Sequence, residues 1–68
     1  MHFVYIMLLD ILDTKWEGMR IFLNDTQAIE ASIGNPDYRV EIFEVDTDGS
    51  FKPSLNYYKS GIFITPYN

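Results

Sequence analysis

The sequence predicts a small α+β fold, an antiparallel-dominated sheet of four to five strands with one helix packed on one face (ββαβββ order). Three observations indicate this class: an almost entirely apolar run at residues 2–9, one capped helical segment, and short extended segments separated by turn residues. With 68 residues the chain is long enough for one domain, residues 1–68. A domain of this size buries only about 60% of its unfolded surface, so we expect packing or association to supplement its stability.

Residues 2–9 predict a central strand, because nearly every residue is apolar and many are β-branched or aromatic. A buried helix would give a similar pattern, but the short length favours a strand. A strand that is apolar on both faces belongs in the middle of a sheet. Alternation places Val4, Ile6 and Leu8 on one face and Phe3, Tyr5, Met7 and Leu9 on the other.

A short strand at residues 19–23 and a helix of about ten residues follow. Asn24 is a strong N-cap, and Gln27 stands at the capping-box position three residues later. We expect Gly34 to take a left-handed conformation at the helix C-terminus, and Pro36 prevents continuation. The expected apolar stripe consists of Ile29 and Ile33, flanked by Ala28 and Ser32.

Residues 38–46 predict a strand whose alternation is imperfect, which indicates two partly buried faces or a bulge near Phe43. An extended segment at residues 50–58 contains Pro53, which suits an edge strand or a bulge. After a turn, residues 62–65 form a last short strand. If the helix makes a right-handed crossover, the first strand lies between its two neighbours, and the sheet order is 2-1-3-4 with the last hairpin extending the edge.

The segment DTDGSF at residues 46–51 has the aspartate–glycine spacing of a calcium-binding loop. With Gly49 at the sixth position of such a loop, the twelfth falls on Leu55, where a bidentate glutamate is required. Strand patterns also flank the segment where helices are required. We therefore expect a hairpin turn here, since glycine accepts a positive φ.

Few residues of the chain are suited to catalysis or to holding a cofactor. Cysteine is absent and His2 is the only histidine, so we expect no metal site and no other cofactor. No serine lies in a nucleophile-elbow context, and no glycine-rich phosphate loop is present. We expect a protein without enzymatic activity; an enzyme would require a deep pocket with carboxylates converging around His2.

The net charge of −5 opposes direct binding of nucleic acid and of anionic membranes, since both attract lysine and arginine. The apolar run at residues 3–9 is far shorter than the roughly 20 residues that span a bilayer. No basic region precedes this run and Asp10 interrupts it, so we do not expect a signal peptide. These features predict a soluble, intracellular protein.

Five carboxylates follow the third predicted strand and its turn. Such a row could imitate a nucleic-acid backbone and occupy the basic groove of an enzyme. We favour the alternative, a solvated edge whose charge prevents aggregation, because Arg39 interrupts the row and alternation divides the carboxylates between faces. The residues of this acidic strip are Asp37, Glu41, Glu44, Asp46 and Asp48.

Aromatic residues gather in the first and last thirds of the chain. We expect most of them in the core, although tyrosine and tryptophan are also frequent in protein interfaces. The first group is Phe3, Tyr5 and Trp16, and the second is Phe51, Tyr57, Tyr58, Phe63 and Tyr67.

One ten-residue helix is roughly 15 Å long and covers one face of a small sheet. The other face then carries a large apolar patch, which usually marks an interaction surface. We expect this face, or an edge strand of the sheet, to pack against another protein, most simply a second copy of the chain, unless Ile11, Leu12 and Trp16 fold over the face as a lid. The predicted interface residues are Phe3, Tyr5, Met7, Leu9, Trp16, Phe43 and Val45.

Residues 16–61 contain a series of short segments: Trp16-Glu17, IFL and AIEASI, Asn35-Pro36, RVEIF and the closing NYYKSG, with Ser60-Gly61 in place of an Asn-Gly turn. In these segments the chain resembles a group of short proteins encoded by giant (nucleocytoplasmic large) DNA viruses. The group has no assigned activity, so the resemblance implies a viral origin and transfers no functional residue. The leading interpretation is a non-enzymatic protein-interaction module, a viral accessory or minor structural protein of the host cytoplasm or virion. The alternative is an acidic mimic of nucleic acid that inhibits a DNA- or RNA-binding enzyme.

Overall fold

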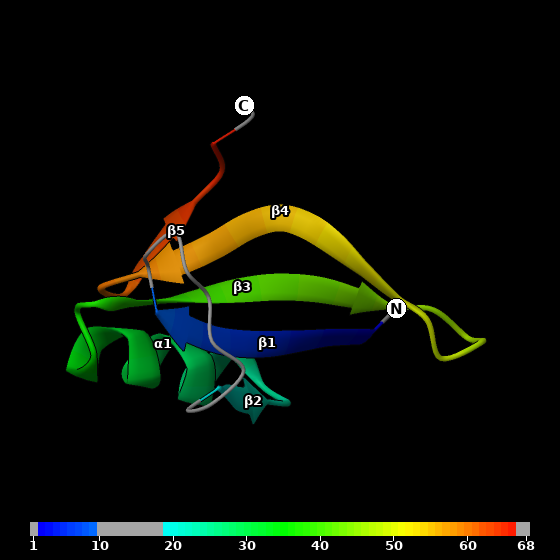
Figure 1. Ribbon diagram of the computed structural model, residues 1–68, viewed down its shortest axis with the longest axis horizontal. Helices are drawn as coiled ribbons and strands as arrows, with labels where there is room; N and C mark the ends of the chain where they lie inside the picture. The colour runs from blue at the N-terminus through cyan, green and yellow to red at the C-terminus, as the bar shows by residue number, and fades with distance from the viewer. Residues whose placement is uncertain (1, 10–18, 67–68) are drawn as a thin grey trace.

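The computed structural model describes residues 2–9 and 19–66, which form one helix on a five-stranded sheet (Figure 1). All neighbouring strands are antiparallel, and their order is β2-β1-β3-β4-β5. β2 and β3 both pair with β1, so they run parallel to each other on either side of it. The predicted fold class and strand order are confirmed. The elements are β1 (His2–Leu9), β2 (Arg20–Phe22), α1 (Asp25–Gly34), β3 (Tyr38–Val45), β4 (Phe51–Lys59) and β5 (Ile62–Ile64).

The strand register decides which apolar residues lie under the helix. Met7 lies opposite Val40, and both are buried against Ala28 of α1. Phe43 lies opposite Val4, on the other face of the sheet. Alternation shows which residues of one strand share a face, but only strand pairing and helix docking show which face is covered. The sequence pattern predicts six apolar residues of β1 and β3 together on one face that the helix leaves uncovered. That prediction is wrong, because the β1 residues of this set lie on the helix side and the β3 residues on the opposite side. The six residues are Phe3, Tyr5, Met7, Leu9, Phe43 and Val45.

The helix packs on the sheet through small side chains. Ala28 and Ser32 are both 0% exposed, whereas Ile33 is 61% exposed. Because Ala28 and Ser32 are one turn apart, they form a small-residue face that lets the helix backbone approach the strands closely. The predicted stripe is therefore only partly correct: Ile33 lies at the surface, beside the β4–β5 turn at Gly61.

Two asparagine side chains cap the helix. Oδ1 of Asn24 accepts a hydrogen bond from the backbone N–H of Gln27 at 2.9 Å, which confirms the predicted N-cap. At the other end, Gly34 stays within the helix and has no positive φ. The prediction of a left-handed Gly34 is wrong, because Asn35 is the C-cap and its Nδ2 donates to the carbonyl of Ala31 at 2.8 Å.

The DTDG segment forms the β3–β4 hairpin turn, as predicted. Gly49 has a φ of 87°, and its N–H donates to the carbonyl of Asp46 at 2.9 Å. The hydroxyl and the N–H of Ser50 both donate to Oδ1 of Asp48, at 2.7 and 3.0 Å. Side chains of this segment thus take part in the hydrogen bonds of the turn.

A bulge follows Pro53 in β4. The pairing of β3 with β4 shifts between Glu41 and Phe43, so that Ile42 alone faces residues 54–56. In Figure 1, β4 arches away from β3 where these two extra residues are inserted. The prediction of Pro53 at a bulge or edge is confirmed. β3 itself pairs with β1 in one unbroken register from Tyr38 to Val45, so its imperfect alternation reflects two partly buried faces, and the extra residues of the bulge belong to β4.

The side chain of Ser54 makes hydrogen bonds where the bulge interrupts the regular pairing of β3 with β4. Oγ of Ser54 donates to the carbonyl of Ile42 at 2.7 Å and accepts from the N–H of Asn56 at 3.2 Å. Leu55 has a left-handed φ of 69°, a conformation that costs a residue with a Cβ about 1–2 kcal/mol. The bulge is therefore a strained but internally hydrogen-bonded part of the strand.

Candidate functional site

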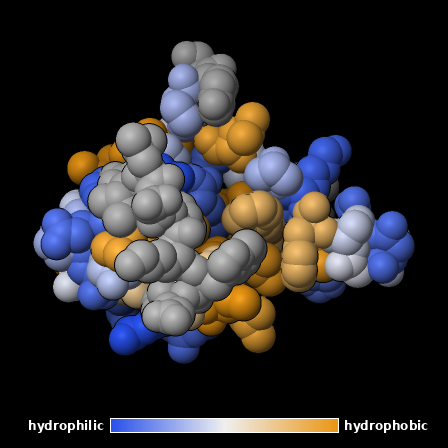
Figure 2. All heavy atoms as spheres, viewed as in Figure 1, coloured by the Kyte–Doolittle hydropathy of each residue, from blue (hydrophilic) through white to orange (hydrophobic). Residues whose placement is uncertain are grey.

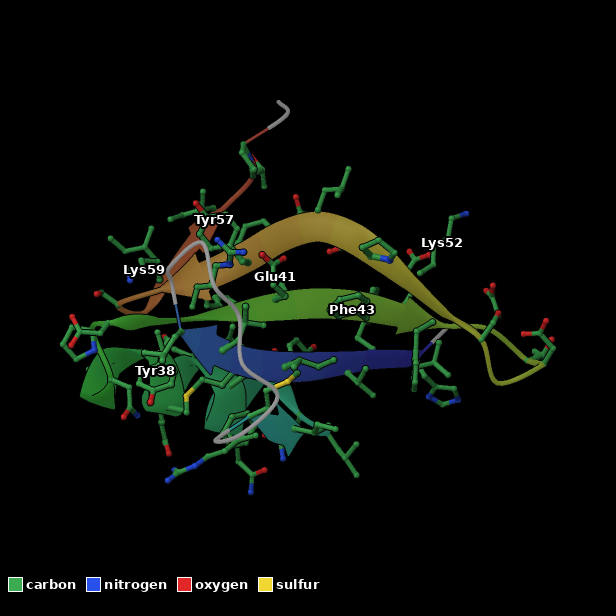
Figure 3. All side chains as sticks on the ribbon, in the orientation of Figure 1. Tyr38, Glu41, Phe43, Lys52, Tyr57 and Lys59 are labelled. Atoms are coloured by element: carbon green, nitrogen blue, oxygen red, sulfur yellow. The ribbon has the colours of Figure 1, made fainter. Side chains whose placement is uncertain are left out.

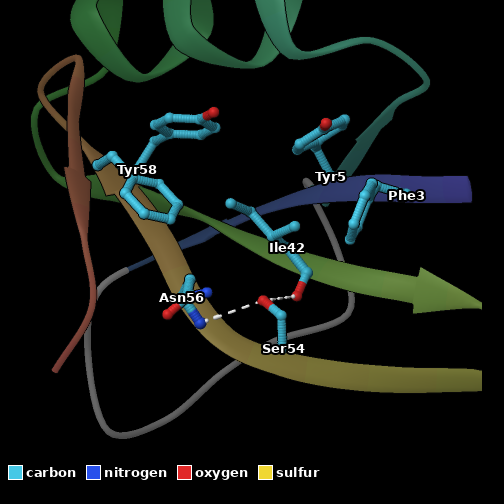
Figure 4. A pocket seen from close by; sticks show the side chains of 7 residues that line it. Phe3, Tyr5, Ile42, Ser54, Asn56 and Tyr58 are labelled. Carbon is cyan, nitrogen blue, oxygen red and sulfur yellow. Dashed lines mark hydrogen bonds between the residues drawn. The ribbon is translucent and has the colours of Figure 1, made fainter. Parts of the chain in front are cut away.

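A half-open, mostly apolar hollow of about 210 Å³ lies on the helix side of the sheet, beside the bulge of β4 (Figure 4). Figure 4 shows Phe3 and Tyr5 on one side of Ile42 and Tyr58 on the other. The polar side chains of the bulge, Ser54 and Asn56, also border it. The lining residues are Phe3, Tyr5, Ile42, Ser54, Asn56, Tyr58 and Phe63.

Two features of the fold leave this space open. The ten residues of α1 span roughly 15 Å, whereas the eight residues of β1 or β3 span about 26 Å. The helix therefore covers only part of these strands, as Figure 1 shows. The bulge, in addition, carries the backbone of β4 away from β3 at Ile42. The hollow forms where the helix cover ends and the bulge begins.

Three of the rings that line the hollow form a continuous row. The ring centroids of Tyr5 and Tyr58 are 6.3 Å apart with an interplanar angle of 34°, and those of Tyr58 and Phe63 are 5.7 Å apart at 57°. Both distances lie in the range of favourable aromatic pairs. Phe63 is 52% exposed and Phe3 is 38% exposed, so part of the aromatic surface is open to a ligand.

The tyrosine hydroxyls lie in partly desolvated and negatively charged surroundings. Burial raises the pKa of Tyr5, and the Asp25 carboxylate and Tyr58 raise it further. Burial and Asp25 also raise the pKa of Tyr58. Both hydroxyls therefore stay protonated at neutral pH and can donate hydrogen bonds. Asp25 is the exposed first residue of α1.

The predicted interface residues of β1 are divided between the hollow and the core. Phe3 and Tyr5 line the hollow. Met7 is only 2% exposed and belongs to the core, which removes it from any contact surface. Leu9 is half-buried at the far end of the strand, opposite Tyr38.

The remaining predicted interface residues do not join this site. Phe43 and Val45 are half-buried on the face of the sheet that α1 does not cover. Trp16 lies outside the described residues, as do Ile11 and Leu12 of the alternative lid.

The predicted acidic strip extends over both ends of β3. Asp37 precedes the strand, whereas Asp46 and Asp48 follow it, and eight residues of strand span about 26 Å. Figure 2 shows hydrophilic side chains at the protruding end of the molecule and apolar ones nearer its middle. Hydrogen bonds from Ser50 hold the pKa of Asp48 below its usual value, so this carboxylate serves the turn.

The two carboxylates within β3 lie on opposite faces. Nε of Arg39 is 2.9 Å from Oε1 of Glu41, and the Arg39 guanidinium lies 5.8 Å from the ring centroid of Tyr57. Figure 3 labels Glu41 and Tyr57, which pair across β3 and β4. Glu44, on the helix side, faces Lys52 across the same two strands. Both carboxylates therefore have a basic side chain nearby.

In residues 2–9 and 19–66, no group of three or more His, Cys, Asp or Glu side chains is arranged to hold a metal ion. His2 is exposed at the start of β1, opposite Val45. The described part of the chain contains no helix with the length and hydropathy that a membrane crossing requires.

The sequence does not single out Ser54 or Asn56, and it treats Tyr58 and Phe63 only as members of an aromatic group. The structure brings Tyr58 and Phe63 together with Phe3 and Tyr5 of β1, so members of both aromatic clusters of the sequence meet at one site. Pro53 is the sequence signal closest to the site, because it indicates the bulge that opens the hollow.

Comparison with protein-family models, with curated proteins and with solved structures finds no match for this chain. The candidate site therefore rests on its geometry. Its residues come from four strands, β1, β3, β4 and β5, so the complete fold is needed to form it.

Proposed function

We propose that the chain is a non-enzymatic protein-interaction module that binds a side chain of a protein partner in the hollow beside α1. The observation that carries this proposal is a half-open space of about 210 Å³ with aromatic walls. Binding sites are typically concave and apolar with a few polar groups, and aromatic residues contribute strongly at protein interfaces. The sequence resemblance supports a viral accessory or minor structural protein, soluble in the host cytoplasm or the virion.

The backbone beside the hollow supports the same proposal. Leu55 is 50% exposed and has a left-handed φ of 69°, so an apolar side chain is displayed on a strained residue. Strained residues of this kind gather at ligand-binding sites. Contact with a partner at the bulge would bury the exposed surface of Leu55.

The acidic mimic of nucleic acid has less support. A mimic needs a regular row of charges on one surface, but the predicted strip lies at both ends of β3 and on both of its faces. Arg39 also lies against the central carboxylate, Glu41. Salt-sensitive competition with DNA for a basic enzyme would favour the mimic, whereas salt-insensitive association would favour the apolar site.

Selection of peptides from a random display library against the immobilised protein tests the proposal. We expect the enriched peptides to share one anchor side chain and to change the amide chemical shifts of Phe3, Ile42 and Asn56. Failure to enrich a peptide, or shift changes confined to other parts of the sheet, would contradict the proposal. Sedimentation of the protein alone shows whether a second copy is the partner.

Deletion of Leu55 and Asn56 gives a matched variant. It leaves Ser54 as the one residue opposite Ile42, so β4 can pair regularly and the alternation of its side chains is kept. We expect a folded chain that no longer binds the selected peptides. Asn56→Trp, which fills the hollow with an indole, is a second blocking variant. Thr47→Ala in the exposed β3–β4 turn is the control that retains binding.

A further inference from the structure

The hollow combines several aromatic rings with a nearby carboxylate. The faces of aromatic rings attract cations, and cages of such rings bind quaternary ammonium groups and methylated lysine. The volume of about 210 Å³ is far above the roughly 10–15 Å³ that one water molecule requires, so a branched head group can enter. The four rings come from three strands: Phe3 and Tyr5 from β1, Tyr58 from β4 and Phe63 from β5.

The mostly apolar lining of the hollow favours a fully methylated ammonium over a free one. The Ser54 hydroxyl already donates to the carbonyl of Ile42 and accepts from the N–H of Asn56. An unmodified lysine brings three N–H donors, and each donor left unpaired in an apolar site weakens binding. A trimethylammonium group has no N–H and keeps the positive charge, so it requires no hydrogen-bond acceptor from the lining.

Asp25 adds a negative charge at the start of α1. It lies one helical turn before Ala28, and Tyr5 and Tyr58 pack against the cluster that contains Ala28. Its carboxylate also raises the pKa of both tyrosines. The N-terminus of α1 carries a partial positive charge of about half an elementary charge, which offsets only part of the carboxylate charge. Glu44 and Lys52, farther along the same face, lie opposite each other and have opposite signs.

We propose that the hollow binds the trimethyllysine side chain of a partner protein, with the ammonium head among the four rings. This inference rests on the proposed function, because it names the anchor that the partner inserts at the same site. The net charge of −5 adds a longer-range attraction for the basic segment around such a lysine.

Titration of the full chain with three probes, followed by amide chemical shifts, tests the inference. The probes are Nα-acetyl-trimethyllysine amide, its unmethylated counterpart, and a neutral isostere in which tert-butyl replaces trimethylammonium. We expect the trimethyllysine probe to bind about tenfold more tightly than the isostere, the effect of one or two cation–π contacts. We also expect it to bind more tightly than the unmethylated probe.

The outcomes separate this inference from the proposed function. Equal or tighter binding of the neutral isostere overturns the inference and leaves the proposed function in place, because the hollow then takes a neutral apolar side chain. Tighter binding of the unmethylated probe also overturns it. If none of the probes binds, the inference fails, and the display selection decides the proposed function independently.

Two variants separate the contribution of the rings from that of the charge. Phe63 is 52% exposed, so Phe63→Leu keeps the lining apolar, and we expect it to reduce the preference for trimethyllysine over the isostere. Asp25→Asn should weaken trimethyllysine binding about threefold and leave the isostere unchanged. Glu30→Gln, on the same helix, is the matched control and should have no effect. Equal losses of trimethyllysine affinity in Asp25→Asn and Glu30→Gln would show a general effect of charge and would overturn the role of Asp25 at this site.

Discussion

Two halves of the same sheet face, on the same strands, have opposite characters. In the packed half, formed by Met7, Ala28, Ser32 and Val40, no residue is more than 2% exposed. In the hollow half, formed by the seven lining residues, Phe3 is 38% exposed although it lies on the same face of β1 as Met7, four residues away. Both halves are built on β1, which is apolar along its whole length.

The difference shows that cover by α1, more than the hydrophobicity of the strands, decides where the core lies. The small side chains of Ala28 and Ser32 let the helix approach one half closely. Beyond the helix, β4 bulges away, and no second helix in the described residues fills the space. The mostly apolar face is thereby divided into a part for stability and a part available for binding.

The largest expected effect compares equivalent substitutions in the two halves. Met7→Ala should lower the free energy of unfolding by about 3 kcal/mol, because it leaves a cavity under α1. Phe3→Ala, on the same face of β1, should cost about 1 kcal/mol, since its ring is already partly exposed. Urea unfolding measures both values. Equal losses would show that the hollow half is packed as tightly as the other.

Serine substitutions sharpen the comparison. Oγ of Ser32 accepts from the N–H of Gly61 at 2.9 Å and donates to the carbonyl of Ile29 at 2.7 Å, in a fully buried position. Ser32→Ala should therefore cost about 1–2 kcal/mol of unfolding free energy. Ser54→Ala removes two similar hydrogen bonds in the hollow half, but water can replace them there, so its cost should be smaller. A larger loss of unfolding free energy for Ser54→Ala than for Ser32→Ala would contradict the view that the hollow half is the less tightly packed one.

Leu55→Gly should raise the free energy of unfolding by about 0.5–1 kcal/mol, because glycine adopts the left-handed φ of 69° without steric cost. The same variant should weaken peptide binding, since it removes the exposed side chain beside the hollow. Gly49→Ala is the converse control: its φ is 87° and its surroundings are open, so only backbone strain lowers its stability. Thermal unfolding of the unaltered protein and of the two variants tests the expected gain in stability for Leu55→Gly and the expected loss for Gly49→Ala.

The smallest effect is an alkaline loss of stability. Tyr5 and Tyr58 have folded-state pKa values above the ordinary value of 10.0. Their stabilising contribution is therefore fully present below pH 10.0 and is lost as the pH rises through the folded pKa. Urea unfolding between about pH 9 and pH 11 should show this loss. Tyr58→Phe should reduce it, and an unchanged slope in that variant would contradict the assignment.

Much of the local structure could be predicted because its causes are local. The bounds of β1 follow from the apolar run at residues 2–9, the start of α1 follows from the Asn24 cap, and the hairpin turn follows from Gly49. The C-terminus of α1 could not be predicted from Gly34. There, the side chain of Asn35 supplies the cap instead.

The candidate site could be predicted only in part. The aromatic clusters of the sequence contain the rings of the site, and Pro53 indicates the bulge. The polar bulge residues Ser54 and Asn56, however, have no distinctive pattern in the sequence. Their role depends on the shifted pairing opposite Ile42, which joins residues far apart along the chain.

The sequence by itself determined most of the secondary structure and the hairpin turn, because hydrophobic alternation, capping and glycine conformation act between near neighbours. It also indicated the order of the strands, through the right-handed crossover that the helix makes. Only the tertiary structure decided which face α1 covers, how far that cover extends, and where β4 departs from β3. Those outcomes depend on the packing of whole elements against each other. For this reason an apolar strand with two similar faces became buried core at Met7 and an open aromatic site at Phe3.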